Sequence, residues 1–175
     1  MPYQYKREPL PSTDVDKLLN ACKDLKEKLV VYTLLDTGMR VSELTSLKKD
    51  QIHWQEKRIV LFGKGGPYGK KTKRRVVPMS ERVNIAMQSW FTLQDKLDLT
   101  DRAVQYMVKR VANRAGIIKK VTPHVLRHTF AVNCIQKGIS TRALQMFLGH
   151  DRLGTTEIYL NMSPEDALRE FRDKW

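Results

Sequence analysis

Hydrophobic residues recur at helical spacing along most of the chain, and this pattern predicts a mainly α-helical protein. Apolar side chains at i, i+3, i+4 and i+7 fill one face of a helix. Val15, Leu18, Leu19 and Cys22 show this spacing in the first such segment. Helices are expected over residues 13–22, 29–38, 40–47, 80–90, 100–116, 122–138, 141–148, 155–161 and 165–175.

Polar and glycine residues mark the expected ends of these helices. Thr13, with Asp16 three residues later, resembles a capping box at the start of the first helix. Gly38 is expected to end the second helix, because glycine tolerates the left-handed conformation of a C-cap. Further N-cap candidates are Ser80 and Thr122, the second of which is followed by a proline at the first helical position.

Between residues 51 and 78 the pattern changes to short β-rich runs. The runs cover residues 51–54, 58–62 and 75–78, and a Gly/Lys-rich connection separates the last two. Such runs predict a small three-stranded antiparallel sheet. The expected fold class is therefore α+β, mainly α, in one domain without internal repeats.

The composition of the chain favours a polyanion as its partner. The 175 residues carry 32 Lys and Arg against 19 Asp and Glu, a formal charge of +13. Clustered cations bind nucleic acid favourably, because neutralising its phosphates releases condensed counterions. The alternative interpretation of the excess charge is a solvated basic surface with no partner. The N-terminus has no signal-peptide core, and Cys22 and Cys134 show no CxxC spacing. We therefore expect a cytoplasmic, DNA-associated protein.

The segment 122–130 contains the most informative group of polar residues. His124 and Arg127 share a helix face, and both can donate hydrogen bonds to one phosphate. His124 and His128 at i, i+4 also suggest a metal pair, but Val125 stands where the HExxH motif has glutamate. We expect no metal, and His128 is interpreted as a structural helix histidine.

Three further segments contain candidate functional residues. Arg40 stands at a helix start with Glu43 three residues later, and Lys64 lies in the expected hairpin between the second and third strands. His150 precedes a helix that carries Tyr159. Taken singly, Arg40 could be a surface group and Tyr159 a packing residue, since exposed arginines and half-buried tyrosines are common.

Taken together, the order Arg40, Lys64, His124, Arg127, His150 and Tyr159 resembles the catalytic domain of the tyrosine site-specific recombinases and integrases, including the Xer branch. The resemblance rests on the segments TGMRVSELTSL, HVLRHTFAVN and LGHDRLGTTEIYLN, which stand in the family's order. It covers nearly the whole chain. It implies the recombinase catalytic-domain fold, double-stranded DNA as partner and DNA integration or recombination, often in a mobile element.

The resemblance also implies a role for each residue. Tyr159 would attack a DNA phosphate and form a 3′-phosphotyrosyl enzyme, with release of a 5′-hydroxyl. Arg40 and Arg127 would bind the non-bridging oxygens, and His124 and His150 would donate hydrogen bonds to the same phosphate. His124 is also a candidate acceptor of the tyrosine proton. Lys64 would protonate the 5′-oxygen, and Glu43 would orient Arg40 or His124. Neither a metal nor ATP nor another cofactor is implied.

The hairpin departs from the family's usual pattern, because residues 63–75 are longer and more basic than the common turn. Lys70, Lys71 or Lys73 could therefore be the acid instead of Lys64. These lysines, with Arg74 and Arg75, are expected either to follow DNA phosphates or to form a solvated charged surface.

Family members usually carry a helical core-binding domain before the catalytic one. We therefore interpret residues 1–11 as a linker remnant and residues 12–175 as the catalytic domain, with the core-binding domain absent. The C-terminal helix has an apolar stripe at Ala167, Leu168, Phe171 and Trp175. This stripe packs either on its own domain or on another copy, in a homo-oligomer that would be a tetramer in the synapse.

Two other functions remain open at this point. A type IB topoisomerase-like enzyme would use the same chemistry but rejoin the original strand. A basic DNA-binding module without catalysis would need only the charge, and the presence of all six residues argues against it.

Overall fold

The computed structural model describes residues 8–65 and 71–149, and for residues 63–65 and 71–73 it describes the backbone alone. The expected helices at 155–161 and 165–175 lie outside these residues. The elements follow one another as α1 (Ser12–Asn20), α2 (Leu25–Thr37), α3 (Val41–Thr45), the 3₁₀ helix η1 (Lys49–Gln51), β1 (Ile52–His53), β2 (Arg58–Gly65), β3 (Lys71–Pro78), α4 (Glu81–Phe91), α5 (Asp101–Arg114), α6 (Pro123–Gln136) and α7 (Thr141–Leu148). The predicted class, mainly α with a three-stranded antiparallel sheet, is confirmed.

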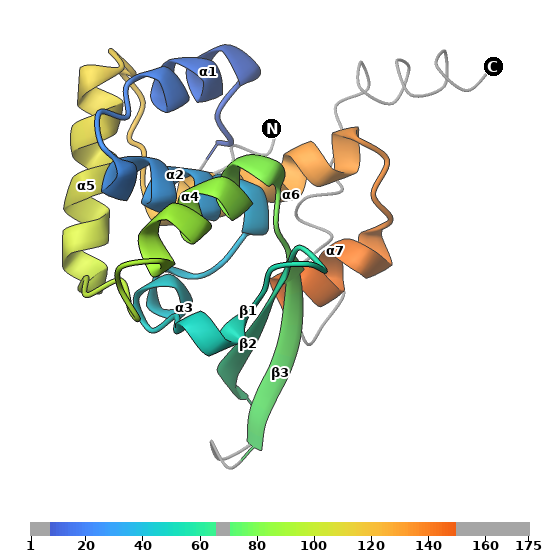
Figure 1. The fold of residues 1–175 in the computed structure, drawn as a ribbon. Coiled ribbons are helices and arrows are strands. Elements are labelled where there is room, and N and C mark those ends of the chain that lie inside the picture. The colour runs from blue at the N-terminus through green and yellow to red at the C-terminus, as the bar shows by residue number, and fades with distance from the viewer. Residues whose placement is uncertain (1–7, 66–70, 150–175) are drawn as a thin grey trace.

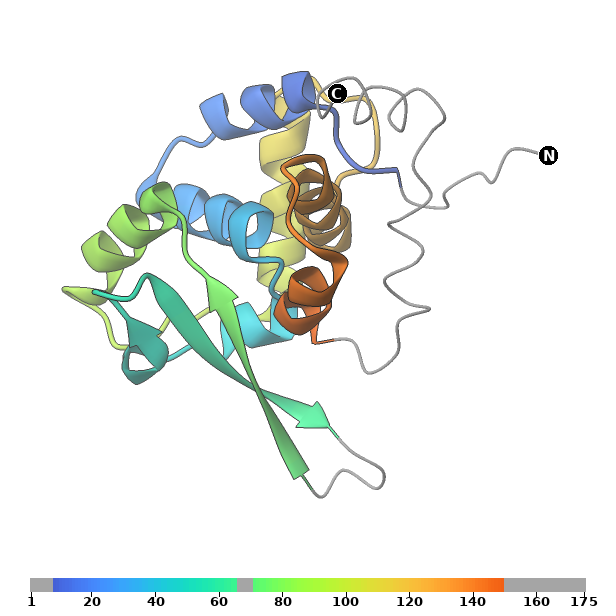
Figure 2. The ribbon, with the colours of Figure 1, turned by 90° about the vertical axis from the view of Figure 1, so that its right-hand side faces the viewer.

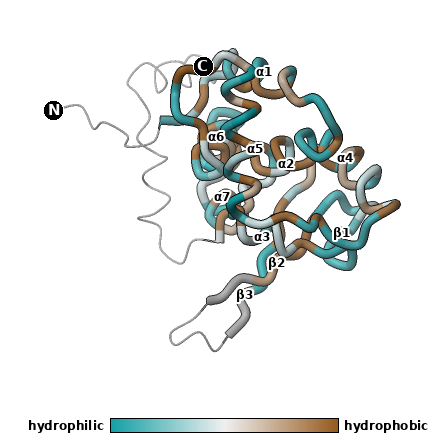
Figure 3. The backbone as a smooth tube through the Cα atoms, turned by 90° about the vertical axis from the view of Figure 1, so that its left-hand side faces the viewer, coloured by the Kyte–Doolittle hydropathy of each residue, from teal (hydrophilic) through white to brown (hydrophobic). Residues whose placement is uncertain are grey.

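Helix α2 forms the centre of the molecule and packs against α4, α5 and α6 (Figure 1). Its side chains Leu29, Val30, Val31 and Leu34 are fully buried. A helix that is apolar on most of its circumference must be covered on several sides, which explains its central place. Hydrophilic and hydrophobic stretches alternate along the surrounding helices in Figure 3, as expected where each helix buries one face.

The three strands pair in the order β1–β2–β3, and both pairs are antiparallel. The long β2–β3 hairpin extends away from the helices, while α7 lies beside β3 (Figure 2). A second apolar cluster, which includes Phe130, Cys134, Leu144 and Leu148, joins α6 to α7. Helix α7 is thus fixed between the sheet and α6.

The predicted helix ends are mostly confirmed. Gly38 adopts a φ of 63° after α2, and the hydroxyl of Ser80 accepts from the backbone N–H of Val83 at 3.4 Å. Thr122 caps α6 in the same way, with Pro123 as its first residue. The capping box at Thr13 is wrong, because α1 begins one residue earlier, where the carbonyl of Pro11 accepts the first helical bonds.

Other boundaries also differ from the prediction, and α2 begins at Leu25 rather than at residue 29. Helix α3 ends at Thr45 rather than near Leu47, because Ser46 adopts a φ of −94° and a ψ of 2°, outside the helical region, and η1 follows. Strand β3 begins at Lys71 rather than Arg75, since backbone pairing with β2 continues as far as Gly65. No helix in the described part of the chain has the length and hydropathy needed to span a bilayer.

Candidate active site

Arg40 and Glu43 form a local unit at the start of α3. Arg40 is the N-cap residue, and its backbone N–H donates to the carboxylate of Glu43 at 2.7 Å. The Arg40 Nη1 donates to the same carboxylate at 3.2 Å. Glu43 is 8% exposed and the Arg40 side chain 47% exposed. The Glu43 carboxylate therefore anchors both the backbone and the guanidinium of Arg40, whose side chain is half exposed.

Arg127 lies in the interior and joins three segments of the chain. It is 5% exposed on α6, and its Nη1 donates to the carbonyl of Gly38 in the α2–α3 connection. Its Nη2 donates to the carbonyl of Leu148 at the end of α7, at 2.8 Å. One guanidinium thus fixes the chain two residues before Arg40 and two residues before His150.

His124 and His128 have different environments although both lie on α6. His124 is exposed in the first turn, whereas His128 is 5% exposed. Burial lowers the pKa of His128, and the nearby His124 lowers it further. A buried imidazole that favours its neutral form agrees with the structural interpretation of His128 and leaves His124 as the residue able to meet a ligand.

Arg75 is buried, whereas a hairpin residue that binds DNA phosphates should be exposed. Its side chain is 6% exposed and forms a two-pronged ion pair with Glu43, Nε to Oε1 at 3.2 Å and Nη2 to Oε2. Arg74, the residue before it, is exposed. Successive side chains of a strand point to opposite faces, so only one of two adjacent arginines can meet solvent here. The expected DNA contact is therefore kept for Arg74 and withdrawn for Arg75.

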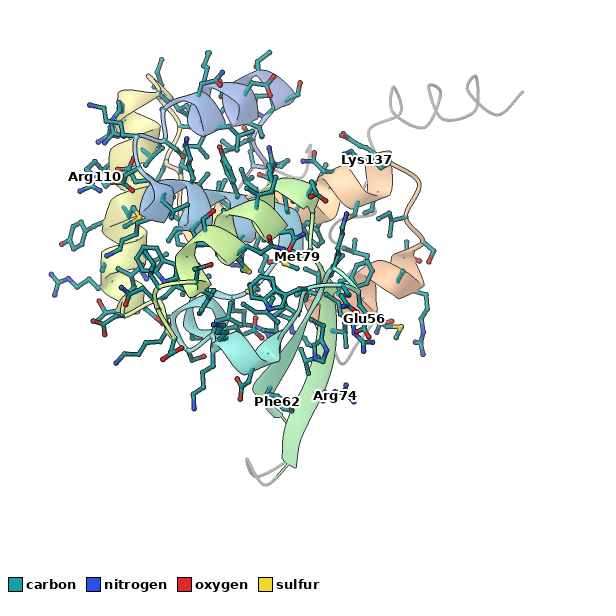
Figure 4. The ribbon with its side chains drawn as sticks, in the orientation of Figure 1. Glu56, Phe62, Arg74, Met79, Arg110 and Lys137 are labelled. Atoms are coloured by element: carbon teal, nitrogen blue, oxygen red, sulfur yellow. The ribbon has the colours of Figure 1, made fainter. Side chains whose placement is uncertain are left out.

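The hairpin carries the other expected basic residues. Lys64 pairs in register with Thr72 and Gly63 with Lys73, so Lys64, Lys71 and Lys73 all belong to the projecting strands. Figure 4 shows Phe62 and Arg74 on this projecting part, and they are paired in register. Lys70, His150 and Tyr159 lie outside the described residues.

A cleft of about 740 Å³ opens beside this site. Its lining includes Val41, which follows Arg40, and His124. It also includes four cations and an aromatic residue that the sequence analysis did not select, namely Arg102, Lys109, Lys119, Lys120 and Tyr106. The signal was present in α5, because Arg102, Tyr106 and Lys109 stand on the side of the helix opposite its buried stripe of Val104, Val108 and Val111.

The charges of the site favour an anion. Burial alone would raise the pKa of the Glu43 carboxyl, but the hydrogen bonds and charge of Arg75, and then those of Arg40, hold it below its usual range. Arg40 and Arg75 therefore meet one ionised carboxylate, that of Glu43. Two guanidinium groups with an adjacent imidazole can hold a phosphate and stabilise extra negative charge on it. Among the described residues no group of three or more His, Cys, Asp or Glu is arranged to hold a metal.

Known proteins are similar to this chain in both sequence and fold. Tyrosine recombinase XerA of Thermococcus onnurineus is 33% identical over 181 residues, which covers 94% of this chain and 61% of that protein. The XerA of Thermococcus kodakarensis is 35% identical with the same coverage. The chain thus spans about three fifths of the length of these relatives.

Solved structures agree with this result. The crystal structure of XerA recombinase matches with a TM-score of 0.82 at 32% identity, over 97% of this chain and 65% of that one. The XerH site-specific recombinase bound to a palindromic difH substrate matches with a TM-score of 0.75 over 98% of this chain and 54% of that one. At 23% identity this second match shows the fold alone. The model of the phage integrase family matches residues 8–166, and the chain therefore belongs to that family.

Proposed function

We propose that this chain is the catalytic domain of a tyrosine recombinase that breaks and rejoins double-stranded DNA through a 3′-phosphotyrosyl intermediate. The observation that carries the proposal is the joining of α2, α6 and α7 by Arg127. Its two carbonyl bonds fix the segments that lead to Arg40 and to His150 around one guanidinium. Families that share this fold still differ in chemistry, so the argument rests on these residues.

The proposed reaction exchanges one phosphate ester for another. The phenolic oxygen of Tyr159 attacks phosphorus, a new P–O bond forms, and the bond to the 5′-oxygen breaks. The phenol loses a proton, with His124 as a candidate acceptor, and the 5′-oxygen gains one from Lys64. The reverse reaction with a 5′-hydroxyl rejoins the strand, and no ATP is consumed.

Arg40 and Arg127 would stabilise the transition state by neutralising its non-bridging oxygens. Negative charge on these oxygens grows as the tyrosine attacks, and donors fixed beforehand need no rearrangement at that moment. The main-chain anchors of Arg127 and the Glu43 anchor of Arg40 supply such fixation. Fixed cations would take the place of a metal, so EDTA should leave the reaction rate unchanged.

A nicked duplex tests this proposal. The chain is incubated with a pool of random-sequence duplexes that are 5′-labelled on one strand and nicked at one fixed position in that strand. Cleavage a few nucleotides before the nick then releases a short 5′-hydroxyl product, which diffuses away. A labelled band that survives denaturation is expected. Arg40→Gln and Arg127→Gln should reduce it at least about 100-fold, as expected when a preorganised transition-state donor is lost.

Lys137→Gln is the control, since Lys137 is exposed at the opposite end of α6 from His124. Absence of the labelled band with the unmodified chain would contradict the proposal. The alternatives separate in a second step, in which a 5′-hydroxyl strand of different length is added to the covalent complex. Joining of the new strand supports a recombinase, whereas rejoining of the original strand alone supports a topoisomerase-like enzyme. Retention on DNA without any band supports a binding module.

A further inference from the structure

Arg75 is the buried cation that the proposed chemistry does not use. In the β2–β3 register Arg75 pairs with Leu61, and Phe62 pairs with Arg74. Leu61 is 1% exposed and Phe62 56% exposed, so the two faces of the hairpin differ sharply. The face that holds Arg75 is the one turned toward the helices.

On that face Arg75 holds Glu43 by two hydrogen bonds to the two carboxylate oxygens. The same two oxygens accept from the backbone N–H and from Nη1 of Arg40. Glu43 therefore connects a buried arginine from β3 to the half-exposed arginine at the start of α3. Because each carboxylate oxygen of Glu43 accepts one hydrogen bond from Arg40 and one from Arg75, the carboxylate is held in one orientation. A single partner would let it rotate.

Arg75 also touches the end of α7. A Cβ added to Gly149 would lie 2.6 Å from Cδ of Arg75, closer than carbon atoms approach without displacement. Gly149 adopts a φ of 64° and is followed in sequence by His150. The aliphatic part of Arg75 thus fills the space directly beneath this turn.

The cost of burying Arg75 indicates that packing alone does not explain it. Its Nη1 is buried and has no hydrogen-bond partner among the described residues. Buried donors are nearly always paired, and a buried ion pair is often no more stabilising than apolar residues of equal volume. A role in the site accounts for an arginine where an apolar side chain would pack.

We propose that Arg75 is a positioning residue, which holds Glu43 so that Glu43 orients Arg40 toward the DNA phosphate. This inference rests on the proposed function. The charged groups that act on the Glu43 carboxylate are Arg40 from the start of its own helix and Arg75 from β3. Without Arg75, only Arg40 opposes the effect of burial, so the pKa of the Glu43 carboxyl should rise. A protonated Glu43 can no longer accept hydrogen bonds from both Arg40 donors.

The experiment measures single-turnover formation of the covalent complex as a function of pH for Arg75→Gln and Arg75→Lys, together with each variant's melting temperature. We expect Arg75→Gln to slow the reaction about 10- to 100-fold near pH 7, the range seen when outer partners of metal ligands are removed. Its rate should also fall at a higher pH than in the unmodified chain as the solution is acidified. Arg75→Lys restores a positive charge, so it should recover the original acid limb and part of the rate.

Arg114→Gln is a matched control, because Arg114 forms a two-pronged pair with another buried glutamate, Glu27, and does not line the cleft. It should lower the melting temperature without moving the acid limb. If Arg75→Gln and Arg75→Lys keep the original rate and limb, the inference fails. The inference also fails if both Arg75 variants lose rate only in proportion to their loss of melting temperature, with the acid limb of the pH profile unmoved. A strong covalent band from the unmodified chain in either case leaves the proposed function standing.

Discussion

Arg127 has a structural task that lysine cannot perform. Its guanidinium reaches two carbonyls on different segments, Gly38 and Leu148, in fixed directions. A lysine ammonium is a single point of donation on a shorter, more flexible side chain, and it lacks the planar fork that serves both acceptors. The position therefore requires both the charge and the shape of arginine.

Arg127→Lys is expected to lower the free energy of unfolding by about 1–3 kcal/mol, because one buried carbonyl loses its donor. Chemical denaturation followed by circular dichroism measures this, and covalent-complex formation should fall in parallel. Unchanged stability would show that the two carbonyl bonds do not hold these segments together.

Gly38 is restricted by its backbone and by its neighbour. Its φ is 63°, and a Cβ there would overlap Cδ1 of the Phe130 ring. Gly116 has a similar φ of 69° with nothing within 4 Å. Comparing the two glycines therefore separates the cost of the backbone conformation from the cost of the contact.

Gly116→Ala should cost about 1–2 kcal/mol of unfolding free energy, the penalty of the left-handed conformation. Gly38→Ala should cost about 1–3 kcal/mol more, as expected for overpacking in a core. Denaturant midpoints of the two variants at matched slope test this. Equal losses would mean that the Phe130 ring moves away without cost.

At the scale of elements, α2 is joined to α5 by charge as well as by apolar packing. Glu27, 2% exposed, accepts from Arg114 at 2.7 Å and from Arg110 at 2.9 Å. The hydrogen bond from Arg114 outweighs the effect of burial, and the pKa of Glu27 falls from 4.5 to about 2. The stability from this pair is therefore complete above about pH 4.5 and is lost as pH falls through 2.

Arg114→Gln should lower the free energy of unfolding at pH 7, because the buried Glu27 carboxylate loses two hydrogen bonds. It should also reduce the dependence of that free energy on pH between 4.5 and 2, because Glu27 would then titrate nearer its ordinary range. Urea unfolding at several pH values measures both effects. An unaltered pH dependence would assign the acid sensitivity to other groups.

Element positions were predictable where the signals are local. Gly38, Ser80 and Thr122 act within one turn of the chain, and each lies where the sequence placed it. The predicted capping box at Thr13 was wrong, because the carbonyl of Pro11 accepts the first helical hydrogen bonds. Several residues near the start of a helix can resemble caps in the sequence.

The site was only partly predictable. Arg40, Glu43, His124 and Arg127 follow from motifs, but the pairing of Glu43 with Arg75 joins residues 32 apart through tertiary structure. One signal was available, since Arg75 alternates in phase with the buried Val77 in β3. The basic run around it concealed this alternation and suggested a solvated surface instead.

At the scale of the whole molecule, the charge of +13 divides between the interior of the site and the open surface. Arg75 and Arg127 are buried, whereas the cleft beside His124 is lined by Arg102, Lys109 and Lys120 among others. Cations at a surface that faces DNA act mainly through counterion release. The cleft is thus expected to contribute affinity that depends strongly on salt.

Lys109→Ala should weaken binding to random-sequence duplex and reduce the slope of log affinity against log salt concentration by about 1, as expected for one lost phosphate contact. Lys137→Ala is the control at the far end of α6. Fluorescence anisotropy at several salt concentrations measures both slopes. Equal slopes for the two variants would place the DNA elsewhere.

The most direct measurement of the central claim is the chemical identity of the residue joined to DNA. The covalent complex is digested with nuclease and protease, and the nucleotide-bearing peptide is sequenced by mass spectrometry. With trypsin as the protease, we predict that the peptide spans residues 153–169 and carries a 3′-nucleotide on Tyr159, and that Tyr159→Phe yields no such peptide. A nucleotide on any other residue, or an equal yield from Tyr159→Phe, would contradict the account.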